Sequence, residues 1–332
     1  MPKLPARIGK RHALEGAGVG VVLLGLLLWW LLPLGDDPPS GSVKFTTGNK
    51  VGVYYQYAEL LKGALSENMP GLKVQLLQSN GSQANVKSVA ADEAQFAIAA
   101  ADAVAGYEDA HKDGPDELRA VARLYDDYLQ LIVPAGSDVK TVADLKGKRV
   151  GTGLNNSGVR LMANRVLAAA GVSQKEITPM NEGIDTGPRD LMAGKIDAFF
   201  WSGGVPTNGL QPLAAKPFEF RFVAIPPDLV AKMHEQGGPA VYYRSTNMPG
   251  DAYPNLQHGE PVPTVAVANL LITRADTPER LVEWFTRIVI KSRDDIGKNV
   301  HSAQLVDLRT AIYTDPLTLH AGARRYYRSV KP

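Results

Sequence analysis

Residues 43–100 read VKFTTGNKVGVYYQYAELLKGALSENMPGLKVQLLQSNGSQANVKSVAADEAQFAIAA. Short apolar runs alternate here with longer segments of helical character. The pattern predicts strands at 43–46, 73–78 and 96–100, and helices at 52–68 and 82–91. Because alternation of this kind is typical of parallel strands covered by helices, this stretch predicts an α/β fold.

A second unit with the same alternation begins at the apolar run YLQLIV, residues 128–133. Further helices are predicted at 141–145, 158–170, 188–193 and 278–292, and further strands at 149–151, 177–180, 196–201 and 264–273. Residues 203–263 are rich in proline and glycine, so no regular pattern can be assigned to them.

Composition limits the classes of protein that the chain can belong to. It has 332 residues, of which 45% are hydrophobic and 21% charged, so it can bury a sizeable core. A net charge of +2 gives no clustered basic face for nucleic acid. The absence of cysteine excludes disulfides, thiol chemistry and a Cys-based zinc site.

The N-terminal segment predicts where the protein resides. Residues 17–34, AGVGVVLLGLLLWWLLPL, carry no charge and are long enough for a membrane span. Basic residues precede this segment and acidic ones follow it, which predicts a cytoplasmic tail at 1–16 and an extracytoplasmic remainder. A cleaved signal peptide is the alternative, and it exports the same residues. The sequence GDDPPSG at 35–41 is typical of a linker.

Five motifs then occur in a recognisable order. They are TGNKVGVYY at 47–55, GSQAN at 81–85, DLKGKRVG at 144–151, GKIDAFFWSGGVP at 194–206 and HAGARRYY at 320–327. In this order the motifs resemble the TAXI family of solute-binding subunits of TRAP transporters, and the resemblance covers residues 43–328.

The resemblance implies a type II periplasmic binding protein, with two doubly wound α/β lobes joined by two hinge strands and preceded by a transmembrane helix. Lobe I is expected to comprise residues 42–130 and 264–332, and lobe II residues 131–263. The implied function is capture of a small ligand, an amino acid or other carboxylate, and its delivery to a multi-span TRAP permease driven by an ion gradient. No cofactor is implied.

Several candidate ligand-binding residues lie where a predicted strand ends and a helix begins. These residues are Thr47, Gly48, Ser82, Asn155, Asn156 and Ser157. Ligands of open α/β sheets bind at such positions, and free N–H groups at a helix N-terminus attract anions. An acidic ligand could therefore be held with little formal positive charge.

Other candidates have an equally plausible structural role. Ser82 could be a helix N-cap, and Asn85 could close a capping box instead of contacting ligand. One of the two tyrosines in the first helical turn is expected to line the cleft, and Tyr54 is preferred. Arg160 in a first helical turn and Trp201 at a strand end are candidates for the same cleft, although Trp201 could equally pack between lobes.

The chain departs from the family pattern at several of these positions. Where the family has Gln-Ser-Asp after a strand, this sequence has Ala100-Ala101-Asp102, and only Asp102 is kept as a site candidate. Ser-Gly-Thr becomes Ser157-Gly158-Val159, and two customary glycines are Asn49 and Val51. Loss of polar groups puts an unmodified glutamate site in doubt and favours a carboxylate with a larger apolar portion. The alternative is that these positions lie outside the pocket.

Catalytic function is not expected from these residues. The sequence has no G-x-S-x-G elbow, P-loop or H-E-x-x-H motif, and its six histidines show no metal-ligand spacing. Asp126-Asp127 is an adjacent carboxylate pair in a possible cleft position, but it could equally be a solvated turn. An anchored ligand sensor without transport is a further alternative to a transport subunit.

Overall fold

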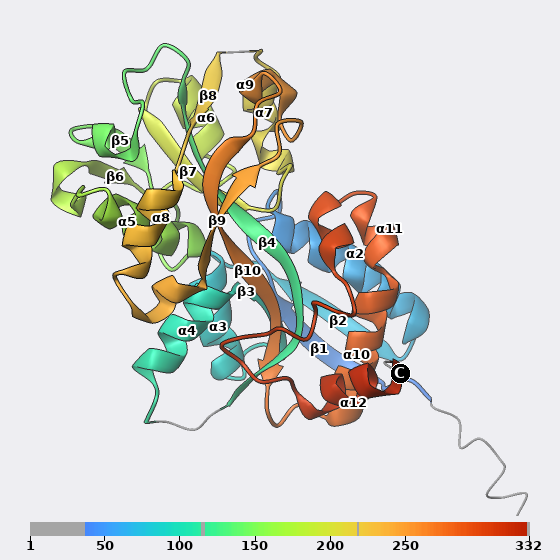
Figure 1. Ribbon diagram of the computed structural model, residues 1–332. Coiled ribbons are helices and arrows are strands. Elements are labelled where there is room, and N and C mark those ends of the chain that lie inside the picture. Colours follow the sequence, from blue (N-terminus) through green and yellow to red (C-terminus); the bar gives the residue numbers. More distant parts are fainter. Residues whose placement is uncertain (1–36, 114–116, 218, 331–332) are drawn as a thin grey trace, which may run out of the picture. The chain divides into compact units, whose positions relative to one another are not determined.

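The computed structural model describes residues 37–113, 117–217 and 219–330. Residues 39–332 form one compact unit (Figure 1). The predicted tail and membrane segment, residues 1–34, lie outside the described residues. Over the part of the chain that is described, no helix is both long and apolar enough to cross a membrane.

The strands and helices of the opening stretch occur as the sequence predicts, each within two residues of the expected bounds. They are β1 (Gly41–Thr46), α2 (Val53–Asn68), β2 (Leu72–Leu77), α3 (Ser82–Ala90) and β3 (Phe96–Ala100). Helix α4 (Ala101–Ala110) follows directly. We call these elements the β1–β3 group. The pairs β1/β2 and β1/β3 are parallel, as strand–helix–strand alternation requires.

A second set of parallel strands forms the β5–β7 group. It comprises η1 (Val142–Leu145), β5 (Arg149–Gly151), α5 (Gly158–Ala169), β6 (Thr178–Met180), α6 (Gly187–Met192) and β7 (Ala198–Gly203). Strand β5 pairs in parallel with both β6 and β7.

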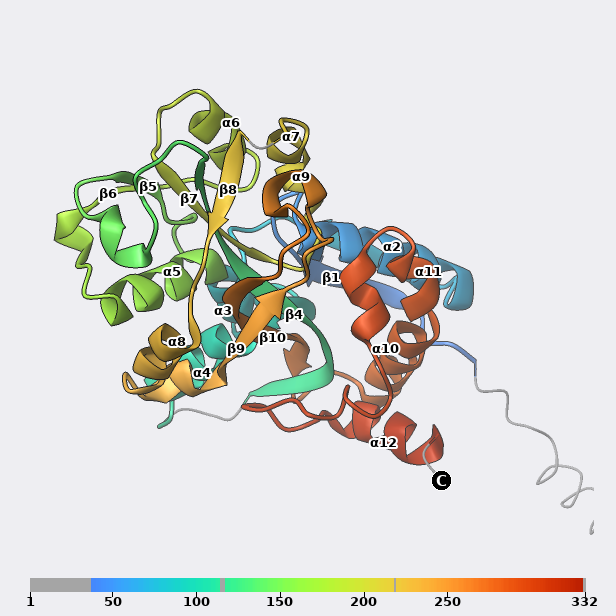
Figure 2. The same ribbon diagram turned by 45° about the horizontal axis from the view of Figure 1, so that its top comes forward.

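Two long strands, β4 (Leu118–Pro134) and β10 (Val262–Arg274), connect the two groups (Figures 1 and 2). They pair antiparallel with each other, while β10 pairs with β3 and β4 pairs with β7. The strand order is therefore β2-β1-β3-β10-β4-β7-β5-β6, in one continuous sheet. Strand β4 begins ten residues before the predicted run at 128–133.

The segment that could not be read from sequence contains short elements. They are α7 (Gln211–Ala214), β8 (Phe220–Val223), α8 (Pro227–His234), β9 (Tyr243–Met248) and α9 (Pro254–Gln257). Strand β8 extends the sheet beside β4, and β9 extends it beside β10. The chain ends with α10 (Glu279–Lys291), α11 (Arg293–Gly297) and α12 (Ala321–Val330).

Three apolar clusters hold these layers together. One joins β1 and β3 to α2, α10 and α12, and so unites residues 43–125 with residues 271–327. A second lies wholly within residues 132–256, around Phe199 and Tyr253. The third lies beneath α3, α4, α5 and α8 and includes residues of both groups. In the first cluster Phe96 and Phe285 stack with ring centroids 3.9 Å apart.

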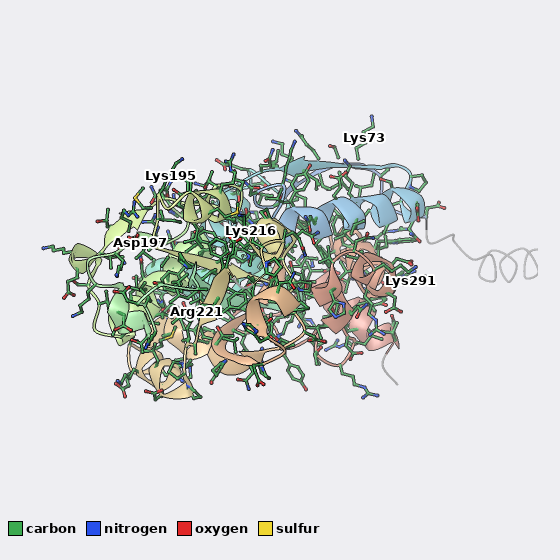
Figure 3. The ribbon with its side chains drawn as sticks, turned by 90° about the horizontal axis from the view of Figure 1, so that it is seen from above. Lys73, Lys195, Asp197, Lys216, Arg221 and Lys291 are labelled. Atoms are coloured by element: carbon green, nitrogen blue, oxygen red, sulfur yellow. The ribbon has the colours of Figure 1, made fainter. Side chains whose placement is uncertain are left out.

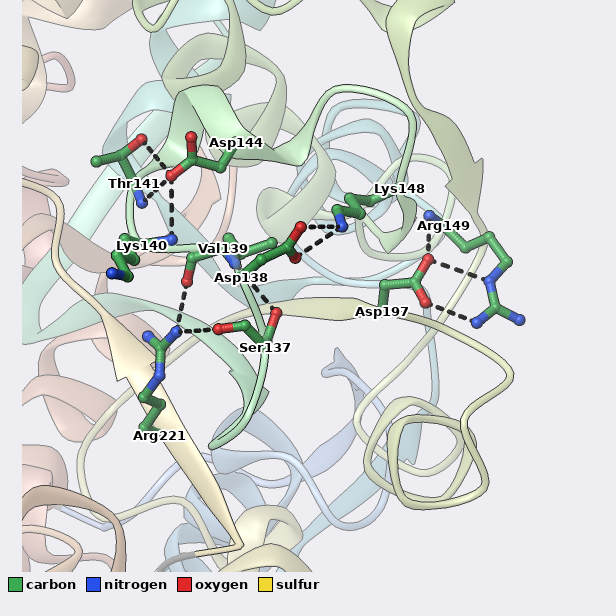
Figure 4. Close-up of polar contacts among 10 residues, drawn as sticks. All are labelled: Ser137, Asp138, Val139, Lys140, Thr141, Asp144, Lys148, Arg149, Asp197 and Arg221. Carbon is green, nitrogen blue, oxygen red and sulfur yellow. Dashed lines mark hydrogen bonds and ion pairs between the residues drawn. The ribbon is translucent and has the colours of Figure 1, made fainter.

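The motif DLKGKRVG has a structural role in this fold (Figure 4). Asp144 accepts hydrogen bonds from the backbone and side chain of Thr141 and so forms a capping box at η1. Arg149 donates to both carboxylate oxygens of Asp197, at 2.6 and 3.1 Å. These hydrogen bonds lower the pKa of Asp197. Asp197 therefore has a structural role.

Candidate functional site

A cavity of about 70 Å³ lies between the two groups of elements, beside the long strands. Its polar lining comes from the β1–β3 group, from β4 and from the β5–β7 group. The polar lining residues are Asn49, Tyr54, Asn80, Ser82, Asp127, Ser157, Glu182 and Ser202. The cavity therefore depends on segments that are far apart in sequence.

Three helices begin at this cavity. Helix α2 follows Gly52, α3 follows Gly81 and α5 follows Ser157, and all three preceding residues line the cavity. Gly52 and Gly81 have no side chain that could cap the first turn, whereas Ser157 Oγ accepts from Arg160 N–H at 3.0 Å. First-turn N–H groups and the positive ends of three helix dipoles therefore converge on the cavity.

Tyr54 connects the cavity to the strands beneath it. Its hydroxyl lies 3.0 Å from Ser82 Oγ and 3.3 Å from Asp127 Oδ2, and it also donates to Asn269 Oδ1. Ser82 Oγ in turn accepts from Ala100 N–H at 3.1 Å. This network joins α2, α3, β4 and β10, so it fixes the positions of both helix N-termini relative to the long strands.

Two carboxylates line the cavity. Asp127, in the middle of β4, is only 4% exposed, and burial raises the pKa of its carboxyl to about 7. Glu182, in the loop after β6, is 8% exposed. Among the described lining residues there is no lysine, arginine or histidine. The exposed lysines labelled in Figure 3, Lys73, Lys195, Lys216 and Lys291, do not line the cavity.

Much of the cavity lining is apolar. The apolar lining residues come from several elements, and they are Val53, Ala100, Leu154, Val159, Ile184, Trp201 and Val267. The indole Nε1 of Trp201 donates to Thr207 Oγ1 at 3.0 Å, so its polar atom is already used inside the protein. Trp201 therefore offers the cavity an aromatic surface and no free donor.

Of the eleven residues predicted from sequence, five line the cavity and six do not. The five are Gly48, Tyr54, Ser82, Ser157 and Trp201. Gly81 is the N-cap of α3 and Ser82 its first helical residue, so the expectation that Ser82 caps the helix was wrong. With Gly81 as the N-cap, Asn85 lies one residue beyond the N3 position that a capping box requires.

Asn85 is fully buried, and its side chain is used within the protein. Its amide donates to Thr47 O at 2.6 Å and Ile98 O at 2.8 Å, while its Oδ1 accepts from Thr46 and Ser79 hydroxyls. All four of its hydrogen-bonding positions are occupied, so none remains for ligand. Thr47 is likewise buried, and its hydroxyl donates to Leu77 O at 2.9 Å.

Asp102 and Arg160 also make internal contacts. Asp102 is fully buried and accepts from Tyr243 OH at 2.7 Å, and burial raises its pKa to about 6. Arg160 donates to Gly153 O at 2.7 and 3.0 Å and to Asn181 Oδ1 at 3.2 Å. Neither side chain lines the cavity. Asp102 is bound by Tyr243, and Arg160 is bound to Gly153 and Asn181.

Asn155 and Asn156 lie at the junction of the two groups, outside the cavity. Asn155 O accepts from Asn80 Nδ2 at 3.0 Å, and Asn156 O accepts from Ala84 N–H at 3.1 Å. Ser157 O accepts from Gln83 Nε2 at 2.8 Å. Backbone carbonyls of the loop before α5 thus bind the start of α3, which brings the two helix N-termini together.

Sequence reasoning named Asp127 only as part of an adjacent carboxylate pair in a possible cleft position, with a solvated turn as the alternative. It missed Glu182 as a cavity residue and Asn269 as part of the network. The position of Asp127 directly before the largely apolar run 128–133 is the signal that could have identified it as a buried carboxylate. Glu182 follows a three-residue strand, and no sequence pattern distinguishes it from a surface residue. Over residues 37–113, 117–217 and 219–330, no cluster of His, Asp or Glu could hold a metal ion.

Solved structures share this architecture. A putative L-cystine ABC transporter from Listeria monocytogenes matches with 14% identity and a TM-score of 0.51, covering 80% of this chain and 98% of its own. A structure from Bordetella bronchiseptica RB50 matches with 18% identity and a TM-score of 0.50, covering 88% and 90%. A structure described as a periplasmic transporter matches with 15% identity and the same TM-score, covering 88% and 93%.

The fold is therefore the mixed α/β fold of periplasmic-binding-protein-like structures, with the cavity beside its two long connecting strands. A family model, described as the NMT1-like family, matches residues 45–330. The chain belongs to the NMT1-like family.

Proposed function

We propose that this protein is the extracytoplasmic solute-binding subunit of a transporter, of the TAXI type that serves TRAP permeases. The proposal is supported by the family match over residues 45–330 and by the fold shared with transport-associated structures. The five sequence motifs favour the TAXI type among such proteins. In this function the protein captures a small ligand and delivers it to a multi-span membrane permease.

The observation that carries the proposal is the convergence of three helix N-termini on one cavity between two groups of strands. Ligand sites of open α/β folds lie at the carboxyl ends of strands, where helices begin. The cavity combines such N-termini with apolar lining side chains. This combination suits a ligand with an acid group and a hydrophobic portion.

The acid group of the ligand is assigned to the N-termini of α3 and α5, at Ser82 and Ser157. These two N-termini are close, since a Cβ atom at Gly158 would lie only 2.9 Å from Ser82 Oγ. A carboxylate bound there is stabilised by N–H groups of both helices. The apolar portion of the ligand then packs against Ile184 and Trp201.

Ligand capture is proposed to close two lobes, residues 42–130 with 264–332 and residues 131–263. The apolar clusters at 43–125 with 271–327 and at 132–256 support this division, while the third cluster spans both lobes beside β4 and β10, which serve as the hinge strands. Hydrogen bonds from Asn80, Gln83 and Ala84 to the loop before α5 join the two proposed lobes, and we assign these contacts to the closed form.

The proposed location is the cell membrane, with the bulk of the chain outside the cytoplasm. Residues 17–34 are assigned to a single-pass anchor, or alternatively to a cleaved signal. Immunoblotting of membrane fractions with an epitope at residue 3 tests this assignment. Retention of the epitope on the membrane-bound protein supports an anchor, and its loss supports cleavage.

A thermal-shift screen of the full-length protein in detergent tests the ligand class. Dicarboxylates, amino acids and branched or aromatic acids form the panel. We expect stabilisation by acids with an apolar portion, because binding to the folded state raises the melting temperature. Tight binding of glutamate without any response to apolar acids would contradict this assignment of the ligand.

A further inference from the structure

A buried polar cluster lies directly behind the cavity, at the junction of α4, α5 and β9. Helix α4 begins immediately after Ala100, and β9 begins at Tyr243, which is in register with Val267 of β10. Ala100 and Val267 both line the cavity. The hydroxyl of Tyr243 donates to Asp102 Oδ2 at 2.7 Å, and this contact is buried. The cluster therefore adjoins the cavity without lining it.

The polar members of this cluster come from both proposed lobes. Asp102, on α4, belongs to lobe I, whereas Arg165, on α5, and Tyr243 belong to lobe II. Residues at the end of α8 connect the two members from lobe II. Gln236 Nε2 donates to Arg165 O at 3.0 Å, and His234 Nε2 lies 2.8 Å from Tyr243 O. A movement between the lobes therefore shifts Arg165 and Tyr243 together, relative to Asp102.

Two complementary groups of the cluster lack a partner. Asp102 Oδ1 is closed to solvent and has no hydrogen-bond partner in the described part of the chain, and the same holds for Arg165 Nε. A buried carboxylate oxygen and a buried donor are each unfavourable when unpaired. The guanidinium of Arg165 lies over the ring of Tyr243, 5.9 Å from its centroid. Both unpaired groups thus adjoin the same tyrosine, and each supplies what the other lacks.

The surroundings favour a direct contact between these two charges. Burial raises the pKa of Asp102 to about 6, whereas the Tyr243 hydroxyl, backbone N–H groups and the charge of Arg165 lower it. The carboxyl is therefore ionised at pH 8, within an apolar cluster that includes Val104 and Val166. Opposite charges attract more strongly in such surroundings than in water, and a buried charge without a partner is costly.

We propose that Asp102 and Arg165 form a latch between the two lobes, in which Arg165 pairs directly with Asp102 when ligand closes the cavity. Tyr243 binds Asp102 and offers the aromatic surface on which Arg165 lies before pairing. The side chain of Arg165 is only partly buried, so it can change rotamer without repacking the core. The inference rests on the proposed solute-binding function and concerns how its closed form is stabilised. Asp102 and Arg165 are then positioning residues, since neither lines the cavity.

Calorimetry on the full-length protein in detergent tests the latch at pH 8, where Asp102 is ionised. The probe is whichever of 4-methylpentanoate, 3-phenylpropanoate, L-glutamate and glutarate binds the parent most tightly. Asp102→Asn and Arg165→Gln should each weaken binding about tenfold, because each removes one half of the pair. The double variant should also lose about tenfold, and not the roughly hundredfold that independent effects would give.

Two further variants separate the latch from other effects of charge. Arg165→Lys retains a positive charge on a long side chain, so its loss of affinity should be only about threefold. Asp109→Asn is the matched control, because it removes a carboxylate from an exposed position of the same helix. Its affinity for the probe should stay within about twofold of the parent.

The stability of the ligand-free protein separates the latch from ordinary packing. The pair forms only in the closed, ligand-bound state, so neither Asp102→Asn nor Arg165→Gln should lower the urea midpoint without ligand. Both variants should nevertheless lose affinity for the probe. A residue needed only for packing would show the opposite pattern, with a lower midpoint and nearly normal affinity of the folded fraction.

The outcomes separate this inference from the proposed function. Losses that multiply in the double variant would overturn the latch and leave solute binding intact, and so would unchanged affinity of Arg165→Gln. A lowered urea midpoint in both single variants would also overturn it, because the residues would then act through packing. If no compound of the thermal-shift panel binds the parent, the solute-binding proposal is overturned and the latch with it.

Discussion

Replacing Asp127 by Asn should stabilise the protein in the absence of ligand, and the gain should depend on pH. The carboxyl of Asp127 has a pKa of about 7 in the folded protein, chiefly because of burial, against an ordinary value of 3.8. Between these values the folded state binds a proton that the unfolded state releases. The stability contributed by this proton is complete below pH 3.8 and is lost as the pH rises through 7.

The size of the effect follows from the two pKa values. One pKa unit corresponds to about 1.4 kcal/mol, so the full penalty above pH 7 is about 4 kcal/mol. The amide introduced by Asp127→Asn cannot ionise and avoids this penalty. Any cost of burying that amide does not change with pH. The difference in unfolding free energy between variant and parent should therefore grow by about 3 kcal/mol from pH 5 to pH 8.

Urea denaturation followed by circular dichroism, at several pH values between 5 and 8, measures this difference. Asp102→Asn is a useful comparison, because burial raises the pKa of Asp102 only to about 6. Its pH-dependent gain should be about half as large and should level off at lower pH. If the difference in unfolding free energy between Asp127→Asn and the parent does not change with pH, burial does not raise the pKa of Asp127, and the reasoning is refuted.

Three further predictions concern packing and closure. Asn85→Ala should cost roughly 2–4 kcal/mol of unfolding free energy, because it leaves buried carbonyls without donors. The folded variant should bind ligand normally. Weakened binding at unchanged stability would instead place Asn85 in the ligand site. Gly158→Ala should weaken ligand binding by about 1–3 kcal/mol, since the new Cβ lies 2.9 Å from Ser82 Oγ. Gly136→Ala is the control, because its Cβ has no atom within 4 Å. Equal calorimetric affinities of the two variants would refute the close approach of the α3 and α5 N-termini. Phe285→Ala should cost about 3–5 kcal/mol in urea denaturation by removing the stack on Phe96, and a cost below about 1 kcal/mol would contradict that packing.

Much of the fold was predictable because periodicity and turn residues mark its helices and parallel strands. The opening stretch and the helix at 158–170 follow this rule. Strand β4 was predicted only in part, because Arg119, Arg123 and two aspartates interrupt its apolar pattern. Strands β8 and β9 were missed, since short strands between proline- and glycine-rich turns have no clear periodicity.

The site was predictable to the extent that backbone geometry determines it. Gly48, Ser82 and Ser157 each follow a strand end or begin a helix, and they line one cavity because the carboxyl ends of the strands meet there. The roles of polar side chains were harder to predict. Asn85 and Asp102 follow the same kinds of turn as the cavity residues, but they bind buried partners from other elements. Only the tertiary structure shows whether a polar group is satisfied inside the protein or left for ligand.

The central claim, that ligand closes two lobes over this cavity, is tested most directly by a distance measurement between spin labels. The sequence contains no cysteine, so Lys73→Cys and Lys195→Cys can be labelled uniquely at exposed positions of the two proposed lobes. Double electron–electron resonance on the full-length protein should show a shorter and narrower distribution of the distance between the two labels when a ligand from the screen is saturating. The control pair Lys73→Cys and Lys291→Cys, within lobe I, should show no change. An identical Lys73–Lys195 distribution with and without saturating ligand would contradict the account.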